Sequence, residues 1–94
     1  MNLPEFDISG QKALVVGAGR GIGKGIALAF AEAGVDVAIA GRTPTYVAKV
    51  AGEIEALGRS ALPLSGDATK ATDMDEIAKQ TLSEFGHVDI LVTV

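Results

Sequence analysis

Short apolar segments alternate with longer amphipathic segments along the whole chain. Residues 12–16 form an apolar, β-branched run that ends directly before Gly17. Further strands are predicted at 35–40 and 60–64, and a last apolar run covers 88–94. Runs without regular polar alternation are typical of strands that are buried on both faces of a parallel sheet. The pattern therefore predicts a sheet with such strands rather than a bundle of helices.

The segments between these strands have apolar side chains at the spacing of an α-helix. The first predicted helix covers 21–33 and stops before Gly34, the second runs from its N-cap Thr43 to Gly58, and the third runs from its N-cap Thr72 to Gly86. The third helix has acidic residues in its first turn, where the helix dipole favours negative charge: Asp73, Asp75 and Glu76. The apolar stripes expected to face the sheet are Ile22, Ile26, Ala29 and Phe30 in the first helix, Val47, Val50, Ala51, Ile54 and Leu57 in the second, and Met74, Ile77, Ala78 and Phe85 in the third.

This alternation of strands and helices predicts an α/β fold in which βαβ units build a parallel sheet. Because such crossovers are right-handed, the first two helices cover one face of the sheet. If the fourth strand returns beside the first, the strand order is 3-2-1-4 and the third helix covers the other face. We therefore predict a partial Rossmann-type, doubly wound parallel sheet (β-α-β-α-β-α-β), with a ligand-binding crevice between strands one and four.

Glycine is concentrated between the first strand and the first helix, with five glycines between Gly17 and Gly25. A P-loop needs Ser or Thr after its lysine, but Gly25 follows Lys24, so this interpretation fails. The strict dinucleotide pattern Gly-x-Gly-x-x-Gly fails as well. The pattern that fits is Gly-x-x-x-Gly-x-Gly on Gly17, Gly21 and Gly23, because the apolar run ends directly before Gly17.

Each of these glycines has a physical role in such a turn. Gly17 permits the tight turn out of the strand, and Gly23 lets the helix lie close to the strand. Gly21 lets the backbone approach a diphosphate at the amino end of the helix, where unpaired N–H groups favour an anion. The alternative is a flexible glycine-rich surface loop, which has no reason to coincide with this spacing.

Three segments of the chain resemble the short-chain dehydrogenase/reductase family. The segment Val15–Ala27 is similar to the family's cofactor motif, Thr-Gly-x-x-x-Gly-Ile-Gly. Gly66-Asp67-Ala68-Thr69 resembles the family's Asp-Val contact with adenine, and Phe85–Val92 resembles the approach to its Asn-Asn-Ala-Gly motif. The resemblance covers essentially the whole chain and implies a nucleotide-dependent oxidoreductase.

The chain departs from the family pattern in three places. Val16 replaces the motif threonine, and Thr93 and Val94 stand where the two asparagines would be. The chain ends before the family's Ser and Tyr-x-x-x-Lys, so no catalytic residue is assigned. Tyr46 and Lys49 are one residue too close for that pair, and Tyr46 is interpreted as structural. We expect residues 1–94 to be the NAD(P)-binding portion of a single-domain enzyme, with the catalytic part absent.

The resemblance also suggests which dinucleotide binds. NAD-preferring members place an acidic residue at the end of the second strand, whereas this chain has Ala40-Gly41-Arg42 there and no acid before Glu53. A guanidinium can pair with a 2′-phosphate that a carboxylate would repel. We therefore expect NADP, with NAD as the alternative, unless Arg20 and Arg42 are only solvated surface charges. The expected cofactor-binding residues are Gly17, Gly19, Arg20, Gly21, Ile22, Gly23, Gly41, Arg42, Asp67 and Ala68.

Composition excludes several other classes of protein. The chain has no cysteine and a single histidine, His87, which excludes a thiolate nucleophile and a cysteine or histidine metal cage. A net charge of −4 with dispersed Lys and Arg does not favour a duplex nucleic-acid binder. No apolar run has the length of a membrane span, so we expect a cytoplasmic protein.

The expected function is NADP(H)-dependent interconversion of an alcohol and a ketone or aldehyde by hydride transfer. The resemblance implies a small-molecule alcohol or carbonyl substrate and, for the full-length enzyme, a homo-oligomer. Two alternatives remain: a non-catalytic nucleotide-binding module, and an inactive truncated fragment. Asp67 also has an alternative interpretation, as a cap of the turn after the third strand.

Overall fold

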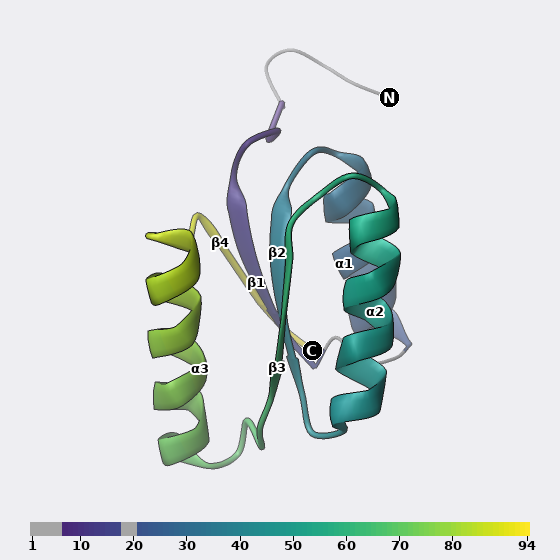
Figure 1. Cartoon of the computed structure of the whole chain (residues 1–94). Helices are drawn as coiled ribbons and strands as arrows, with labels where there is room; N and C mark the ends of the chain where they lie inside the picture. Colours follow the sequence, from purple (N-terminus) through teal and green to yellow (C-terminus); the bar gives the residue numbers. More distant parts are fainter. Residues whose placement is uncertain (1–6, 18–20) are drawn as a thin grey trace.

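The computed structural model describes residues 7–17 and 21–94, and within these ranges strands and helices alternate along the chain (Figure 1). The elements are β1 (Lys12–Val16), α1 (Ile22–Glu32), β2 (Asp36–Gly41), α2 (Pro44–Ala56), β3 (Ala61–Ser65), α3 (Ala71–Phe85) and β4 (Ile90–Thr93).

The strands form one parallel sheet in the order β3-β2-β1-β4, as predicted. In the register, Val15 of β1 lies beside Ile39 of β2 on one side and Val92 of β4 on the other. Helices α1 and α2 cover one face of the sheet and α3 covers the other (Figure 1). The doubly wound α/β fold is therefore confirmed.

The core consists of two layers because successive side chains of a strand point to opposite faces. Ala13 and Val15 of β1 face α1 and α2, whereas Leu14 and Val16 face α3. The layer under α1 and α2 is the larger, and its largest fully buried side chains include Ile39, Ile54, Val15, Val37 and Val50. The two central strands, β1 and β2, are thus buried on both faces as predicted.

The buried faces of the helices agree in part with the predicted stripes. The predicted positions that are buried or packed against the core are Ile26 and Phe30 in α1, Val47, Val50, Ala51 and Ile54 in α2, and Met74, Ile77 and Phe85 in α3. The fully buried residues of α1 are small ones, Gly23, Ala27 and Ala31, whereas the predicted Ile22 is 74% exposed. Leu57 lies after the end of α2 and is 45% exposed. The predicted members Ala29 of α1 and Ala78 of α3 are exposed as well, and the polar Thr81 is buried in α3.

The start of α3 was also predicted wrongly. Its N-cap is Lys70, in an extended conformation, and Thr72 already lies inside the helix. Of the acidic residues predicted for the first turn, only Asp73 lies there. An N-cap is set by where the chain leaves its extended conformation, which the preference for threonine at this position does not determine.

The outer strands are less buried than the sequence suggests. In β3 only Leu64 is buried, and β4 is shorter than the predicted run because Val88 and Asp89 belong to the turn before it. Both strands lie at edges of the described sheet, and Leu91 of β4 is 61% exposed. None of the helices in the described part of the chain is both long and apolar enough to cross a membrane.

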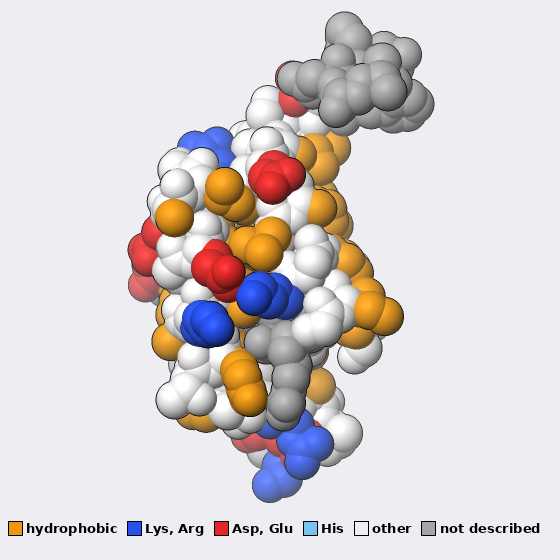
Figure 2. Space-filling view, turned by 90° about the vertical axis from the view of Figure 1, so that its right-hand side faces the viewer, with side chains coloured by type: hydrophobic (Ala, Val, Ile, Leu, Met, Phe, Trp, Pro, Cys, Tyr) orange, Lys and Arg blue, Asp and Glu red, His pale blue; other side chains and the backbone are white. Residues whose placement is uncertain are grey.

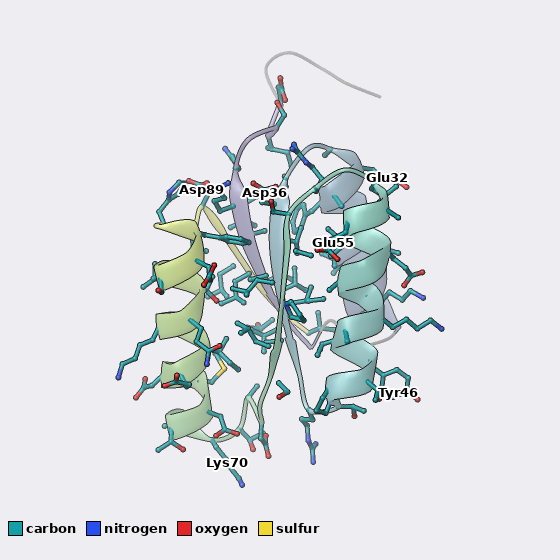
Figure 3. The ribbon with its side chains drawn as sticks, viewed as in Figure 1. Glu32, Asp36, Tyr46, Glu55, Lys70 and Asp89 are labelled. Atoms are coloured by element: carbon teal, nitrogen blue, oxygen red, sulfur yellow. The ribbon has the colours of Figure 1, made fainter. Side chains whose placement is uncertain are left out.

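A polar network holds the amino ends of the strands together, and Figure 3 shows Asp36 and Asp89 at that end, opposite Lys70. The Lys12 ammonium pairs with the Asp36 carboxylate, which also accepts the N–H of Ser60 at 3.0 Å. Asp89 accepts the N–H of Lys12 at 2.8 Å and so ties the start of β4 to β1. Burial alone raises the pKa of Asp36, but the hydrogen bonds and the positive charges around it outweigh burial and hold this pKa below its ordinary value of 3.8.

Candidate functional site

The turn that leaves β1 requires glycine. Gly17 has a φ of +92°, a conformation that L side chains rarely adopt, and its N–H donates to the Ala40 carbonyl at 2.7 Å. A Cβ at this position would lie 3.1 Å from the carbonyl oxygen of Val94. The N–H of Val94 donates to the carbonyl of Val16 at 3.0 Å. The backbone at Gly17 is therefore packed into the carboxyl edge of the sheet, between β2 and the residue that follows β4.

Helix α1 begins at the same edge. Gly21 is its N-cap, with a φ of +65° and a ψ of −134°, and Gly23 in the first turn is buried. The first N–H groups of a helix have no partner within it and carry the positive end of its dipole. This end of α1 is therefore suited to an anion. The predicted site residues Gly19 and Arg20 lie outside the described residues.

A cavity of about 230 Å³ lies at this carboxyl edge. It brings together five predicted site residues, Gly17, Gly41, Arg42, Asp67 and Ala68, which come from the ends of β1, β2 and β3. The carboxyl ends of parallel strands meet at one edge of a sheet, which is why residues 50 positions apart converge here. Within the described part of the chain, four further residues line the cavity: Val16, Gly66, Thr69 and Val94. Gly21, Ile22 and Gly23 do not line it and belong to the amino end of α1.

Charge gathers around this cavity. Figure 2 shows basic and acidic side chains together at the lower end of the molecule, where β1, β2 and β3 finish in Figure 1. Hydrogen bonds from the hydroxyl and the N–H of Thr69 hold the pKa of Asp67 below its ordinary value, and the positive charges of Arg42 and Lys70 act in the same direction. Arg42 thus lies within electrostatic reach of Asp67, and a cation and an anion share the cavity.

Asp67 caps the turn after β3. Its Oδ1 accepts the N–H of Thr69 at 2.9 Å and the hydroxyl of Thr69 at 2.6 Å. Its own N–H donates to Oδ2 of Asp73 at 2.8 Å. The turn-cap interpretation of Asp67 is confirmed, and it leaves the proposed contact with adenine open because the two roles are compatible.

Sequence reasoning missed several residues of this region. Gly66 and Thr69 belong to the segment that resembles the family's contact with adenine, but they were not named as site residues, although both line the cavity. Asp73 was interpreted only as a favourable charge at the start of a helix, although its carboxylate binds the loop. Val94, which was considered only as a departure from a family motif, closes the cavity beside Gly17.

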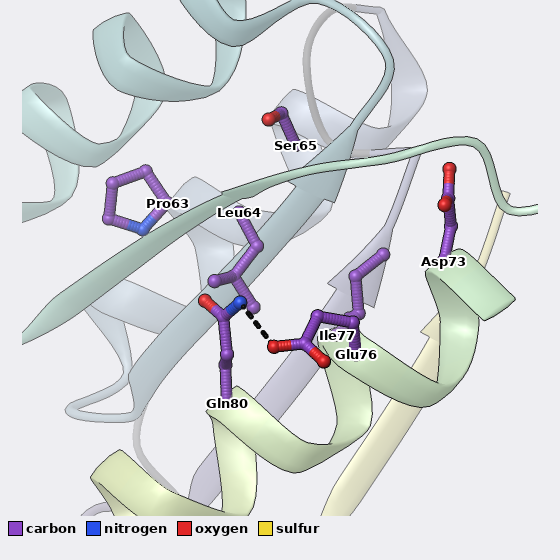
Figure 4. A pocket seen from close by; sticks show the side chains of 7 residues that line it. All are labelled: Pro63, Leu64, Ser65, Asp73, Glu76, Ile77 and Gln80. Atoms are coloured by element: carbon purple, nitrogen blue, oxygen red, sulfur yellow. Dashed lines mark hydrogen bonds between the residues drawn. The ribbon is translucent and has the colours of Figure 1, made fainter.

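A second cavity, of about 290 Å³, lies between β3 and α3 (Figure 4). It is lined by Pro63, Leu64, Ser65, Asp73, Glu76, Ile77 and Gln80. Gln80 donates its amide to Glu76 at 3.1 Å, so two of its polar groups already bind each other. None of the predicted site residues that the structure describes lines this second cavity. No group of three or more His, Cys, Asp or Glu residues within 7–17 and 21–94 is placed to hold a metal ion.

Tyr46 and Lys49, which could be confused with a catalytic pair, do not belong to the cavity at the carboxyl edge of the sheet. Tyr46 lies in the first turn of α2 and is 39% exposed, and neither it nor Lys49 lines the cavity. His87 lies in the turn before β4, at the other end of the sheet, where its Nε2 lies 3.1 Å from Oδ2 of Asp89. Asp89 therefore orders that turn.

Comparison with known proteins gives a consistent picture. A family model described as short chain dehydrogenase matches residues 11–94. The chain is 41% identical over 92 residues to an uncharacterized oxidoreductase of Mycobacterium tuberculosis, covering 98% of this chain and 35% of that protein. It is also similar to the crystal structure of a short-chain type dehydrogenase/reductase from Mycobacterium marinum, with a TM-score of 0.87 and 44% identity over 92% of this chain and 35% of that one.

A second similar structure contains a nucleotide. It is a 3-ketoacyl-(acyl-carrier-protein) reductase from Brucella melitensis complexed with NADH, with a TM-score of 0.83 and 42% identity over 89% of this chain and 33% of that one. The chain thus spans about a third of the length of the relatives it matches.

Proposed function

The chain belongs to the short-chain dehydrogenase family, and from that premise we propose that it forms the cofactor-binding portion of an NADP(H)-dependent oxidoreductase. The reaction proposed for the whole protein is the interconversion of an alcohol and a ketone or aldehyde. When bound, the dinucleotide supplies or accepts the hydride of that reaction. The residues described below hold the dinucleotide and orient it.

The residues at the carboxyl edge fit such a group. Gly17 leaves open the space that a Cβ would fill beside Val94, and the unpaired N–H groups at the start of α1 suit the diphosphate. Ile22, the first residue of α1, keeps a large apolar side chain 74% exposed at this edge, where a bound nucleotide would cover it. The adenine end is assigned to Asp67 and Ala68, which line the cavity on the side of β3.

The proposed preference for NADP rests on the position of Arg42. It lines the cavity directly after β2, the position at which NAD-preferring members of the family have an acid. A guanidinium can form paired, charge-assisted hydrogen bonds with a 2′-phosphate. Family membership alone does not decide between the two dinucleotides, because the similar Brucella melitensis reductase is complexed with NADH. Arg20, beyond the described residues, is proposed as a second cation for the same phosphate.

We propose, as in the sequence-based prediction, that cofactor binding and catalysis are carried out by different parts of the protein. Residues 1–94 bind the cofactor, and the acid–base residues and the substrate pocket belong to the rest of a protein whose relatives are about three times as long. Tyr46 and Lys49 support this division, since their spacing on α2 is one residue short of the family's pair. A homo-oligomeric enzyme and a small alcohol or carbonyl substrate are part of the same proposal.

The test is a titration of NADPH and NADH into the protein, followed by the fluorescence of the reduced nicotinamide. A charge-assisted hydrogen bond contributes about 1.5–3 kcal/mol, which corresponds to roughly a tenfold to hundredfold change in Kd. We expect NADPH to bind at least about tenfold more tightly than NADH, and Arg42→Ala to remove most of this preference by weakening NADPH alone.

The matched control is Lys79→Ala, which removes one positive charge from an exposed position of α3 that does not line the cavity. This variant should bind both dinucleotides like the wild type. A wild type that prefers NADH, or a preference that Arg42→Ala leaves unchanged, would contradict the proposal.

A further inference from the structure

We propose that Asp73 is a positioning residue of the nucleotide site, although it lies on α3 and does not line the cavity at the carboxyl edge. Its carboxylate would hold the loop between β3 and α3 in the conformation that presents Asp67 to the adenine end of the nucleotide. This inference rests on the proposed function and adds to it a residue that neither the sequence motif nor the cavity lining includes.

The hydrogen bonds of the loop carry the first part of the argument. Oδ2 of Asp73 accepts the N–H of Asp67 at 2.8 Å, in a half-buried position. The Asp67 carbonyl accepts the N–H of Lys70 at 2.9 Å, and the Asp67 carboxylate accepts both bonds from Thr69. The backbone N–H, the carbonyl and the side chain of Asp67 are therefore all fixed, and of these bonds the one to Asp73 comes from outside the loop.

Tight packing next to Asp67 gives an independent second observation. A Cβ at Gly66 would lie 3.2 Å from Cδ1 of Ile77 and 3.4 Å from Cβ of Asp73, so the loop backbone is pressed against α3. On its other side, the N–H of Gly66 donates to the carbonyl of Gly41 at 2.9 Å. The loop is thus clamped between the end of β2, where Arg42 follows, and the first two turns of α3. Asp73 contributes both a hydrogen bond and a packing contact to this clamp.

The place of Asp73 in its helix distinguishes this role from ordinary helix capping. Asp73 is the third residue of α3, and an acidic or amide side chain there commonly reaches back to the N–H of the N-cap residue. Here it reaches past the N-cap Lys70 to the N–H of Asp67, six residues before it. The carboxylate therefore binds the loop of the nucleotide site rather than capping its own helix.

Loss of this acceptor has a local consequence. The Asp67 N–H would stay half-buried without a partner, which is costly enough for the loop to leave its position and expose the group to water. The Asp67 carboxylate would then no longer be held beside Arg42. We expect weaker binding at the adenosine end of the nucleotide, with the sheet and its core unchanged.

The experiment measures the binding of 2′,5′-ADP, the phosphorylated adenosine half of NADP, by calorimetry. Asp73→Ala should raise its Kd about tenfold. Asp73→Asn keeps a carbonyl oxygen that can accept the Asp67 N–H, so it should bind within about threefold of the wild type. Asp75→Ala is the matched control, because it removes the same charge from the next turn of α3, and it should bind like the wild type. The Asp67 amide should lose protection against hydrogen exchange in Asp73→Ala alone.

The outcomes separate this inference from the proposed function. A wild type that does not bind 2′,5′-ADP would overturn the proposed function and the inference with it. A wild type that binds, with Asp73→Ala binding equally well or Asp73→Asn binding as weakly as Asp73→Ala, would overturn the inference alone. If Asp73→Ala does not fold, Asp73→Glu takes its place. That variant keeps the charge but displaces the acceptor, and it must also weaken binding for the inference to stand.

Discussion

The replacement Gly17→Ala tests the geometry of the candidate site through stability. An L residue in the left-handed region costs about 1–2 kcal/mol relative to glycine. The new methyl group would also lie 3.1 Å from the Val94 carbonyl oxygen and 3.4 Å from Val94 Cβ, closer than ordinary van der Waals contact for the oxygen. Because Val94 is 61% exposed and can move, this contact adds on the order of 1 kcal/mol rather than more. We therefore expect a loss of about 2–3 kcal/mol.

Two control variants separate the contributions. Gly58 has a φ of +86° and nothing near its would-be Cβ, so Gly58→Ala should show the backbone strain alone, about 1–2 kcal/mol. Gly52 lies within α2, also in open space and without a positive φ, so Gly52→Ala should stabilise the protein by about 0.5–1 kcal/mol.

The assay is urea denaturation followed by far-ultraviolet circular dichroism, since the chain contains no tryptophan. The three variants should rank with Gly17→Ala least stable, then Gly58→Ala, then Gly52→Ala above the wild type. If Gly17→Ala is as stable as Gly58→Ala, the contact with Val94 does not destabilise the variant. If it is as stable as the wild type, the reasoning about this turn is wrong.

Three further predictions concern the frame that holds the site. Stability should fall as the pH drops through and below 3.8, because the pKa values of Asp36 and Asp67 are lowered by folding, so their ionised forms stabilise the protein above that value. Urea midpoints between pH 3 and 7 should therefore fall less in Asp36→Asn than in the wild type, and an equal fall would contradict this account. Asp89→Ala removes the acceptor of the Lys12 N–H and should cost about 1–2 kcal/mol, with faster exchange of that amide; unchanged exchange would refute the tie between β4 and β1. Thr81→Val should stay within about 1 kcal/mol of the wild type in the same denaturation assay, because the buried hydroxyl donates to the Ile77 carbonyl one turn back in its own helix; a larger loss would reveal a further partner of this hydroxyl.

The sequence predicted the centre of the fold better than its edges. β1 and β2 are buried on both faces, so their apolar runs carry the full signal of a strand in a parallel sheet. β3 and β4 have neighbours on one side only within the described chain, and the extent of their burial could not be predicted from residue type. Periodicity placed the helices, and the predicted Ile26 and Phe30 of α1 pack against the core, but the small residues that α1 buries fully, Gly23, Ala27 and Ala31, were not predicted.

The site was predictable where a residue type has a direct chemical meaning. The glycine spacing gave the turn at Gly17, and the convergence of strand ends explains why Arg42 and Asp67 share one cavity. The supporting contacts were not predictable, because the partner of Asp73 is a backbone N–H, which every residue type except proline can present. The roles of the site residues in holding a nucleotide remain predictions.

The central claim is that a dinucleotide binds at the carboxyl edge of this sheet, and amide NMR of the labelled protein titrated with NADPH tests it most directly. The account predicts that the amide signals of Gly17, Gly21, Gly41, Asp67 and Thr69 shift together and saturably, while that of Gln80, which lines the second cavity, stays in place. Shifts confined to the second cavity or to the amino ends of the strands, or no saturable shift at all, would contradict it.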